Sequence, residues 1–578
     1  MSGNKVTLCQ LDTPFSTEGE GFFEYPRPQM KRNSYLSLCG KWELFSCLDG
    51  RLERIGDIKV PFVPESYLSG VYRTKKKTEK YVYRRTFSID SGFVCERVIL
   101  HFGAADQIAR VFVNGTFIGE HRGGYLPFEL DVTESVAMGE NLIEVEITDE
   151  GDTDLAYGKQ RKKRGGMWYT PVSGIWQAVW LESVPEDHIR SIALTPSLDS
   201  ITLRVEGGRD EKTLIIYTDR GECVHTFSGD SITVKLEEPR LWTPDTPYLY
   251  NFTLKSGEDA VESYFALRTV TVEKRGGRQY ICLNGEPYYF HGVLDQGYYP
   301  DGIYLPASPE GYKWDILTMK ELGFNMLRKH IKIEPDLFYY YCDKYGMIVF
   351  QDMVNSGRYD FILDTAFPTV GLRRLPERWA SKKRKEQFES DCRETVRHLY
   401  NHPSVCCYTV FNEGWGQHDA DRLYGVMKEC DPTRVWDTTS GWFAKRKSDV
   451  QSEHIYFKPV KLKRKTDRPL VLSEFGGYSL RVEGHCYNLS KNYGYKLFKS
   501  SEELTEGLSE LYLSEICPEI EKNGLCVSVL TQLSDVEDET NGLCTYDRRV
   551  IKVDNSVMKS IAENIRRAFG KAVSSTAD

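Results

Sequence analysis

The stretch GFNMLRKHIKIEPDLFYYYCDKYGMIVFQD, residues 323–352, decides the fold of the longest part of this 578-residue chain. Two short segments in it, 326–330 and 348–352, are predicted as strands. Residues 335–345, which lie between them, are predicted as a helix. A strand, a helix and a second strand within about 30 residues form the unit from which parallel sheets are built. The stretch therefore predicts an α/β domain with a parallel sheet.

The same alternation continues over the whole C-terminal half of the chain. Strands are predicted at 288–293, 326–330, 348–352, 405–412, 435–440, 454–457, 470–474 and 527–532. Helices are predicted at 308–322, 335–345 and 388–400. Eight repeats of strand and helix are typical of a TIM (β/α)8 barrel.

The N-terminal half has strand signals only. From residue 22 to residue 182, short alternating runs are separated by turn residues, and Asn114-Gly115 has the composition of a hairpin turn. A second series of short strands follows from 189 to 273. We therefore expect a jelly-roll β-sandwich at 20–185, an immunoglobulin-like β-sandwich at 186–274 and a TIM barrel at 275–572.

Composition limits the classes of function. Hydrophobic residues make up 40% of the chain and charged residues 28%, which excludes an intrinsically disordered protein. The net charge of −9 means that the surface as a whole does not attract nucleic acid. Basic runs such as 161–164 are interpreted as solvated faces or as contacts to an anionic substrate. Aromatic residues reach 12%, which fits either stacking on sugar rings or aromatic pairs in β-sheets.

Cysteines and the N-terminus bear on the compartment. The 15 cysteines are scattered and form no C-x-x-C pair, which predicts reduced thiols rather than disulfides or a zinc site. Residues 1–27 contain no apolar core of a signal peptide, and no apolar run has the length of a membrane span. We expect a cytoplasmic protein without a membrane partner. The sequence leaves the oligomeric state open, and a homo-oligomer is compatible with it.

The barrel prediction directs attention to polar side chains at the C-terminal ends of its strands, because the active sites of TIM barrels lie there. The candidates, in chain order, are Asp295, Arg328, His330, Asp352, Asn412, Glu413, Trp442, His454, Tyr456, Glu474 and Gln532.

Two carboxylates in this set have the strongest chemical meaning. Glu413 ends the fourth predicted strand and Glu474 ends the seventh, so both side chains are expected to face one bound ring across the barrel mouth. Cleavage of a glycosidic bond needs such a pair, one group to protonate the leaving oxygen and one to attack or to activate water. The alternative for a single glutamate at a strand end is a cap or an ion pair.

Several short motifs resemble glycoside hydrolase family 2, which comprises β-galactosidases, β-glucuronidases, β-mannosidases and their relatives. The motifs are Phe62-Val63-Pro64-Glu65-Ser66, Ser173-Gly174-Ile175-Trp176, Gly323-Phe324-Asn325-Met326-Leu327-Arg328, Asn412-Glu413-Gly414 and Ser473-Glu474-Phe475-Gly476-Gly477. They occur in order over most of the chain and in two different predicted domains. The resemblance implies the same three domains that the strand patterns predict.

The resemblance also implies a retaining double displacement. Glu413 would be the general acid/base and Glu474 the nucleophile, with their carboxyl groups about 5–5.5 Å apart. Arg328 and Tyr456 would stabilise the charge of Glu474, and Asn412 would bind the 2-hydroxyl of the sugar.

Other candidates are predicted as substrate-binding residues, each with a structural alternative. A satisfied polar layer of the barrel would explain His330, Asp352 and His454 equally well. Asp295 could cap its own loop, and Trp442 could be a core residue instead of a platform for the sugar. Trp168 of the first sandwich is a further candidate for reaching the barrel mouth.

The sugar is less well defined than the reaction. Members of the family that cleave uronides carry an Asn-x-Lys pair near the barrel mouth, and the segment Asp538-Glu539-Thr540-Asn541-Gly542 has none. The acidic segment 535–539 would repel a uronate, so a neutral sugar is expected, with β-galactoside favoured over a β-glucuronide. No metal or other cofactor is assigned. A catalytically silent carbohydrate-binding protein on the same fold is the alternative from another functional class.

Overall fold

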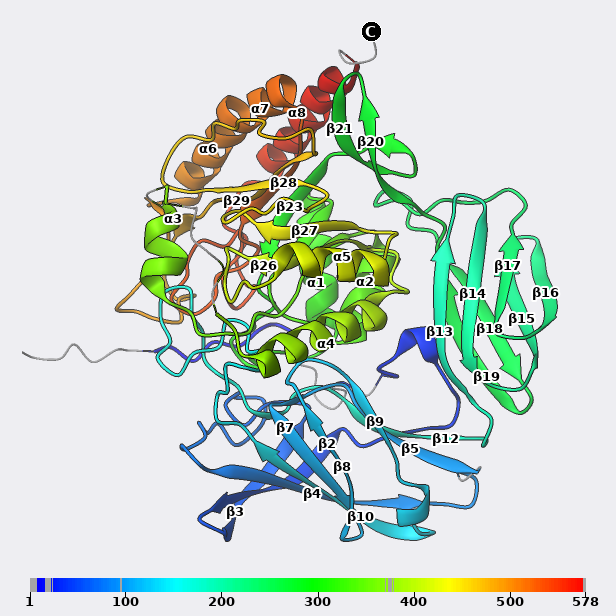
Figure 1. Cartoon of the computed structure of the whole chain (residues 1–578). Helices are drawn as coiled ribbons and strands as arrows, with labels where there is room; N and C mark the ends of the chain where they lie inside the picture. Colours follow the sequence, from blue (N-terminus) through cyan, green and yellow to red (C-terminus); the bar gives the residue numbers. More distant parts are fainter. Residues whose placement is uncertain are drawn as a thin grey trace, which may run out of the picture.

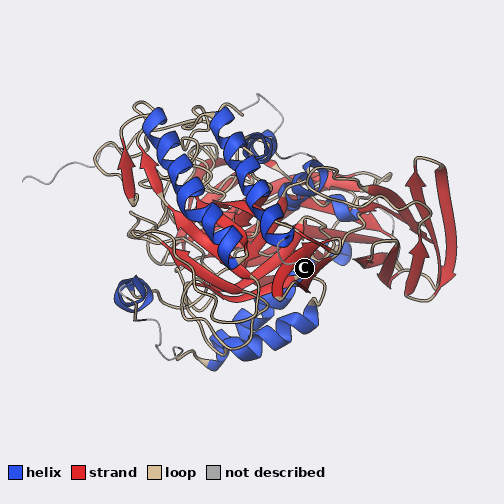
Figure 2. Cartoon of the chain, turned by 90° about the horizontal axis from the view of Figure 1, so that it is seen from above, coloured by secondary structure: helices blue, strands red, loops and turns tan. Residues whose placement is uncertain are grey.

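The computed structural model describes residues 8–15, 22, 24–93, 96–369, 371–372, 377 and 379–574. These residues form two antiparallel β-sandwiches and a parallel β/α barrel, which confirms the predicted fold class. In Figure 1 the first sandwich lies below the barrel and the second sandwich lies to its right. Figure 2 shows the helices gathered around the barrel, while the far end of the molecule is made of strands.

The first sandwich consists of a four-stranded sheet, in the order β1-β12-β5-β9, and a six-stranded sheet, in the order β3-β2-β4-β10-β7-β8. Its strands are β1 (Tyr35–Ser37), β2 (Gly40–Leu48), β3 (Arg51–Val60), β4 (Lys80–Ile89), β5 (Arg97–Phe102), β6 (Ala105–Asp106), β7 (Ile108–Val113), β8 (Thr116–Arg122), β9 (Phe128–Asp131), β10 (Gly139–Thr148), β11 (Gly174–Ile175) and β12 (Val179–Val184). Alternate residues of β10 are buried, as expected for a strand with one face on the core.

The second sandwich packs a three-stranded sheet, in the order β13-β14-β17, against a four-stranded sheet, in the order β16-β15-β18-β19. Its strands are β13 (Ile189–Pro196), β14 (Ser200–Gly207), β15 (Glu211–Thr218), β16 (Gly221–Ser228), β17 (Ser231–Lys235), β18 (Tyr250–Ser256) and β19 (Asp259–Phe265). A small sheet then leads into the barrel, and its strands are β20 (Val270–Arg275), β21 (Arg278–Leu283) and β22 (Glu286–Pro287).

The barrel is an eight-stranded parallel sheet in the order β27-β26-β25-β24-β23-β32-β29-β28. Its strands are β23 (Phe290–Asp295), β24 (Met326–Lys329), β25 (Ile348–Asp352), β26 (Val405–Asn412), β27 (Val435–Ser440), β28 (Gln451–Ile455), β29 (Leu470–Gly476) and β32 (Leu525–Thr531). The sheet is nearly closed, because β27 and β28 are neighbours without a hydrogen-bonded ladder between them. A short pair, β30 (Tyr478–Leu480) and β31 (Lys496–Phe498), lies outside it.

The α-helices are α1 (Glu310–Glu321), α2 (Asp336–Tyr345), α3 (Phe367–Thr369), α4 (Lys382–Leu399), α5 (Ala420–Cys430), α6 (Ser501–Leu511), α7 (Cys517–Asn523) and α8 (Asn555–Ser574). The prediction of eight complete strand–helix repeats is wrong at two places. The connections 441–450 and 456–469, all of whose residues are described, contain no helix. The first is short and begins with a glycine of positive φ, and the second contains Pro459 and ends in Pro469. Both features disfavour a crossover helix.

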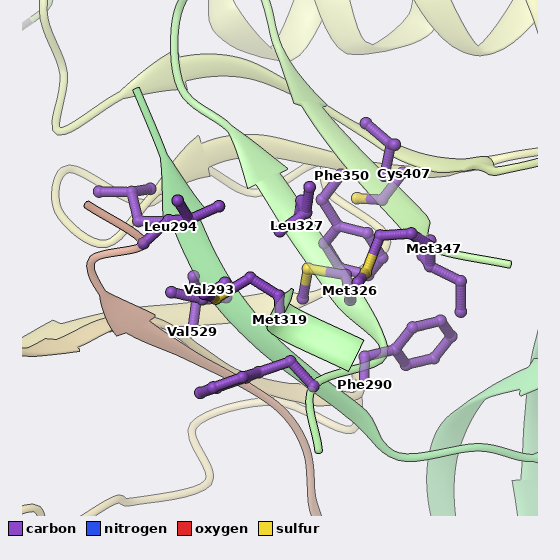
Figure 3. Close-up of a cluster of buried hydrophobic side chains, with 14 of the residues drawn as sticks. Phe290, Val293, Leu294, Met319, Met326, Leu327, Met347, Phe350, Cys407 and Val529 are labelled. Atoms are coloured by element: carbon purple, nitrogen blue, oxygen red, sulfur yellow. The ribbon is translucent and has the colours of Figure 1, made fainter. Parts of the chain in front are cut away.

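The barrel interior is filled by apolar side chains. Figure 3 shows part of this cluster on both faces of the barrel sheet: Leu294 of β23 and Val529 of β32 lie on the inner face, and Val293 of β23 and Leu327 of β24 lie on the outer face. All four are nearly inaccessible to solvent. The barrel is thus a packed core rather than a pore, and only its C-terminal mouth is available for a polar site.

A loop of the first sandwich reaches the barrel mouth. The hydroxyl of Tyr157 donates a hydrogen bond of 2.8 Å to the carbonyl of Gly357, and the amide of Gly357 donates one of 2.6 Å to the carbonyl of Thr153. The amide of Thr170 donates to a carboxylate oxygen of Glu537 at 2.8 Å. The loop 153–170 is therefore fixed over the strand ends. None of the described helices is both long and apolar enough to cross a membrane.

Candidate active site

Two buried carboxylates, Glu413 and Glu474, lie together at the mouth of the barrel. Glu413 directly follows β26, where its φ of +50° turns the chain, and Glu474 lies in the last part of β29. The strands β26 and β29 are separated around the barrel by β27 and β28, and one ligand atom from each of Glu413, His454 and Glu474 lies within 4.8 Å of the others. Glu413 is 6% exposed and Glu474 5%, so the pair is nearly dry while still reachable.

Arg328, on β24, contacts three other side chains of the site. Its guanidinium donates to Asp352 Oδ1 at 3.0 Å, to Glu474 Oε1 at 2.9 Å and to Asn412 Oδ1 at 3.0 Å. Burial alone would lower the pKa of Arg328, but the carboxylates of Asp352 and Glu474 outweigh it and raise the pKa above its ordinary value. Arg328 is therefore a permanent cation that fixes one oxygen of Glu474.

The other oxygen of Glu474 is held by Tyr456. The tyrosine hydroxyl lies 2.7 Å from Glu474 Oε2 and 2.7 Å from Thr531 Oγ1. Burial raises the pKa of Tyr456 well above its ordinary value. The hydroxyl therefore stays protonated and donates a hydrogen bond to the carboxylate. Each oxygen of Glu474 thus accepts a hydrogen bond, one from Arg328 and one from Tyr456.

Glu413 has a different neighbour, the imidazole of His454 on β28. Nδ1 of His454 is 2.8 Å from Glu413 Oε1, and Nε2 faces Ser440 Oγ at 2.8 Å and Arg328 Nη1 at 3.4 Å. Burial lowers the pKa of His454 to about 3, so the ring is neutral. Because the guanidinium can only donate, we assign Nε2 as an acceptor and place the hydrogen on Nδ1, directed at Glu413.

Gly441 makes room for this histidine. A Cβ at position 441, where φ is +78°, would lie 2.3 Å from Cγ of His454. The ring of Trp442 follows, with its centroid 6.0 Å from the centroid of the histidine ring. The turn after β27 therefore holds His454 in place. Trp442 packs against the histidine that contacts Glu413, and is 6% exposed.

His330 and Asp352 form a layer beneath the carboxylate pair. His330 Nδ1 is 2.8 Å from Asp352 Oδ2, while the other oxygen of Asp352 accepts from Arg328. Burial lowers the pKa of His330 to about 3. Burial would raise the pKa of Asp352, but Arg328 and His330 outweigh it and hold the pKa below its ordinary value. Asp352 thus remains the counter-ion of Arg328.

Two predicted site residues lie in other networks. Asp295 accepts from Lys329 Nζ at 2.6 Å and from the amide of Gly297 at 2.8 Å, which agrees with the alternative that it caps its own loop. Gln532 is fully buried, and its amide donates to Asn541 at 2.8 Å and to Glu539 at 3.2 Å. Neither has a hydrogen bond to Glu413 or Glu474 among the described contacts.

An aromatic wall lies beside Glu413, and two of its rings, Trp415 and Tyr359, are not among the predicted site residues. Trp415 follows Glu413 by two residues, and its ring stacks on Trp168 of the first sandwich at 5.3 Å. Tyr359 packs edge-on against both rings, at 4.8 and 5.4 Å. The position of Trp415 directly after the Asn412-Glu413 motif was a usable signal. Trp168 was a candidate for reaching the barrel mouth, and these contacts show that it does.

The acidic segment 535–539 is not a free negative patch. Its carboxylates have internal partners: Asp535 pairs with Lys552 at 2.6 Å, Glu537 with Arg164 at 3.0 Å, Asp538 accepts from Asn488 at 2.7 Å, and Glu539 accepts from Tyr169. The expectation that the segment repels a uronate rested on unpaired charges. The pairing removes that physical reason, although the absence of an Asn-x-Lys pair stands.

Glu413, His454 and Glu474 also offer three ligand atoms at a spacing that a divalent metal ion would accept. The same atoms already have protein partners, since His454 contacts Glu413, and Arg328 and Tyr456 hold Glu474. All three groups therefore have hydrogen-bond partners within the protein.

Family models match most of the chain in three consecutive segments. Residues 68–185 match the model described as glycosyl hydrolases family 2, sugar binding domain, and residues 188–268 match the model described as glycosyl hydrolases family 2. Residues 275–550 match glycosyl hydrolases family 2, TIM barrel domain.

Individual relatives carry two different activity names. A β-galactosidase of Thermoanaerobacter pseudethanolicus is 29% identical over 374 residues, which are 60% of this chain and 46% of that protein. A putative β-glucuronidase of Formosa agariphila is 24% identical over 383 residues, which are 62% of this chain and 34% of that protein. The matched part is thus less than half of either relative.

Solved structures share the whole architecture. A β-D-glucuronidase of Dictyoglomus thermophilum superposes with a TM-score of 0.74 at 20% identity, over 94% of this chain and 98% of that one. A β-galacturonidase of Eisenbergiella tayi superposes with a TM-score of 0.66 at 20% identity, over 93% and 97%. At this identity the likeness is one of fold. With the three consecutive family matches, it establishes that the chain belongs to glycoside hydrolase family 2.

Proposed function

We propose that the protein is a retaining, exo-acting β-glycoside hydrolase that works by double displacement. The observation that carries the proposal is the pair Glu413 and Glu474, whose carboxylate oxygens approach within 4.8 Å. Retaining glycosidases place their carboxyl groups about 5–5.5 Å apart, whereas inverting enzymes leave about 6.5–9.5 Å for a water molecule. The spacing here favours a direct attack by one carboxylate.

The surroundings of Glu474 support its role as the nucleophile. Glu474 receives hydrogen bonds from a cation and from a hydroxyl, which favours the ionised form that a nucleophile needs. Glu413 instead faces the neutral imidazole of His454, and its role as the acid/base follows the resemblance of Asn412-Glu413-Gly414 to the family. Different environments for two neighbouring carboxyl groups are the usual means of separating acid and nucleophile.

The reaction then proceeds in two balanced steps. Glu474 attacks the anomeric carbon while Glu413 gives its proton to the glycosidic oxygen; the aglycone leaves as an alcohol and the sugar becomes an ester of Glu474. Glu413, now a carboxylate, takes a proton from water as the water oxygen attacks the same carbon. The ester bond breaks, the free sugar leaves, and both carboxyl groups return to their starting states.

A panel of nitrophenyl β-galactoside, β-glucoside, β-mannoside, β-fucoside, α-arabinoside and β-glucuronide tests the proposal. We expect release of nitrophenol from at least one of them, and a first-formed sugar with the anomeric configuration of the substrate by NMR. The sequence favours a neutral sugar, β-galactoside first, because no Asn-x-Lys pair follows β32. An inverted first product would contradict the mechanism, and a wild type that binds sugars without cleaving any would favour the silent binding protein.

His454 is expected to set the alkaline limit of activity. Its Nδ1 hydrogen bond favours the carboxylate form of Glu413, so His454→Phe favours the protonated form instead. Activity that requires protonated Glu413 then persists to higher pH. We expect the alkaline limb of the pH profile of kcat/KM to move up by about one unit, the worth of one hydrogen bond, with a lower kcat.

The same measurement on His454→Gln is the control, because its amide can still donate to Glu413. A retained alkaline limb in His454→Gln and a shifted limb in His454→Phe are expected. An unchanged limb in both variants would show that His454 has a packing role only. Because burial lowers the pKa of His454 to about 3, its own titration does not interfere with this limb.

We also propose a reducing compartment, the cytoplasm, for the protein. The 14 cysteines for which the structure describes a state are all free thiols, and most of them are buried. Free thiols in this number are usual where glutathione keeps cysteines reduced.

A further inference from the structure

Phe457 is a large apolar side chain that faces solvent beside the active site. It directly follows Tyr456, whose hydroxyl holds Glu474, and 70% of its surface is exposed. Its φ of +59° lies in the left-handed region, which bulky side chains rarely adopt. Neither the exposure nor the backbone conformation stabilises the fold. Residues in such conformations cluster at active sites and ligand contacts, which indicates a role for Phe457 in binding.

Two tyrosines extend the surface that Phe457 begins. The ring of Phe457 meets the ring of Tyr495 edge-on, with centroids 4.5 Å apart. The centroid of the Tyr495 ring in turn lies 4.4 Å from that of Tyr456 and 5.7 Å from that of Tyr493. We call Phe457, Tyr495 and Tyr493 the aromatic strip. Because Phe457 is mostly exposed, its ring remains available for contact with another flat group.

The backbone holds the aromatic strip in place. The amide of Tyr493 donates to the carbonyl of Asp538 at 2.7 Å, and the amide of Tyr495 donates to the carbonyl of Gly477 at 2.9 Å. Gly477 lies three residues after Glu474 and has a φ of +68°, and a Cβ at this position would lie 2.0 Å from Cδ2 of Tyr495. The chain after the nucleophile therefore leaves room for the Tyr495 ring. A surface that is formed in advance costs little ordering when a ligand binds to it.

A cavity of about 370 Å³ lies beside the strip, between the segment 455–460 and the end of α6. This volume is within the usual range of pockets for small molecules, about 300–1,000 Å³. The aromatic side chains in its lining are Tyr456, Phe457, Tyr478 and Tyr495, and the charged ones are Lys458, Lys496 and Glu515. The cavity therefore continues from the tyrosine that holds the nucleophile along two rings of the strip.

The aromatic strip lies on the side of the leaving group. Glu413 gives its proton to the glycosidic oxygen in the proposed reaction, so the aglycone must lie next to Glu413. Burial is the main cause that raises the pKa of Tyr493 and the pKa of Tyr495, and the charge of Glu413 is a further cause for both. Both hydroxyls thus lie in the electric field of Glu413. A group attached to the glycosidic oxygen can extend from there over the strip.

We propose that Phe457 and Tyr495 bind an aromatic ring of the aglycone, so that the substrates are aryl glycosides. This inference rests on the proposed function and names the leaving group of its substrate. Aromatic rings attract one another in the offset and edge-on arrangements that an exposed ring such as Phe457 permits.

A second sugar fits the same surface less well. Its hydroxyl groups would need hydrogen-bond partners, and acceptors are scarce in the cavity. The carboxylate of Glu515 already accepts from the amide of Val460 at 2.6 Å, and the ammonium groups of Lys458 and Lys496 can only donate. An aromatic ring makes no such demand.

The test measures inhibition by 1-thio-β-glycosides, whose sulfur link resists cleavage, so that binding is measured without the chemistry of the leaving group. The sugar is the one that the nitrophenyl panel identifies. We expect the phenyl thioglycoside to inhibit the wild type with a Ki roughly 10-fold or more below that of the methyl thioglycoside. Phe457→Asn should raise the Ki of the phenyl compound by roughly 5- to 20-fold, the worth of an aromatic contact and of the apolar area that it buries. The Ki of the methyl compound should change by less than about twofold.

Further variants separate stacking from folding. Asparagine tolerates a positive φ, so Phe457→Asn should keep the thermal midpoint of the wild type or exceed it. Phe457→Tyr keeps the ring and should retain the preference for the phenyl compound. Phe117→Ala removes a 49% exposed ring from β8 of the first sandwich, and both Ki values should stay unchanged.

The outcomes separate the inference from the proposed function. A wild type that binds the phenyl and methyl compounds equally, or an equal loss of both in Phe457→Asn, overturns the role of the strip while the hydrolase assignment stands. A thio-linked disaccharide that binds more tightly than the phenyl compound and is weakened in Phe457→Asn assigns the strip to a second sugar and also overturns the inference. If the wild type cleaves no glycoside, the proposed function itself fails, and the inference fails with it.

Discussion

Glu474→Ala is expected to abolish glycoside hydrolysis, with kcat/KM lower by roughly 10⁴-fold or more, the scale of losing a covalent nucleophile. The variant removes the group that attacks the anomeric carbon and leaves Arg328 and Tyr456 without their shared carboxylate. Turnover of the best nitrophenyl glycoside of the panel gives the measurement. Glu453→Gln is the matched control, since Glu453 lies on the neighbouring strand β28 and pairs with Lys465 outside the site.

Rescue of Glu474→Ala by azide distinguishes the loss of a nucleophile from other causes of inactivity. Alanine opens a space where the carboxylate stood, so azide can attack the anomeric carbon from that side and give a glycosyl azide of inverted, α configuration. A rescued variant with an α-azide product supports Glu474 as the nucleophile. Residual activity within about tenfold of the wild type would contradict this role, because no other described carboxylate takes its place between Arg328 and Tyr456.

Glu413→Ala should show a loss that depends on the leaving group. An acidic phenol such as dinitrophenol leaves without protonation, so the first step stays fast while the second step loses its base. For a methyl or alkyl glycoside, which needs the proton, we expect kcat/KM to fall by roughly 10³-fold or more.

The same variant also has a diagnostic rescue. Azide should speed turnover of the dinitrophenyl glycoside and give a β-glycosyl azide, since it attacks the sugar ester of Glu474 from the face where water would. An equal loss for alkyl and dinitrophenyl glycosides would contradict the acid/base role. Far-UV circular dichroism and the thermal midpoint confirm that the variant is folded.

The barrel and its carboxylate pair could be predicted because the signals are local. The segment 326–330 was predicted as a strand, and the structure has β24 at Met326–Lys329. Glu413 and Glu474 stood out because each follows an apolar strand that runs into the mouth of the barrel, and the structure places them together. Neither statement requires knowledge of how distant segments pack.

Features that depend on packing between domains could not be predicted from the sequence. Trp168 lies in a loop of the first sandwich, and only the docking of this loop on the barrel stacks its ring on Trp415. The pairing of Glu537 with Arg164 likewise joins residues far apart in the chain. The composition of the segment 535–539 therefore suggested that it repels an anionic sugar, but its carboxylates are paired within the protein.

His454 shows the same limit within one domain. Its place at a strand end was visible, but its role depends on the turn after β27, where Gly441 leaves room for the ring. The resulting contact with Glu413 makes it a positioning residue for the acid/base rather than a binder of sugar. A one-residue difference in strand register would have turned the ring away, and periodicity does not define register that finely.

The central claim is that Glu474 forms the covalent bond to the sugar, and trapping tests it most directly. The wild type is incubated with a 2-deoxy-2-fluoro-β-glycosyl fluoride of the preferred sugar, which slows hydrolysis of the intermediate more than its formation. The protein is then digested and the labelled peptide sequenced by mass spectrometry. The account predicts one sugar per chain, attached to Glu474 in the segment LVLSEFGG, residues 470–477. A label on any other carboxylate, or turnover of the fluoride without a label and with an inverted product, would contradict it.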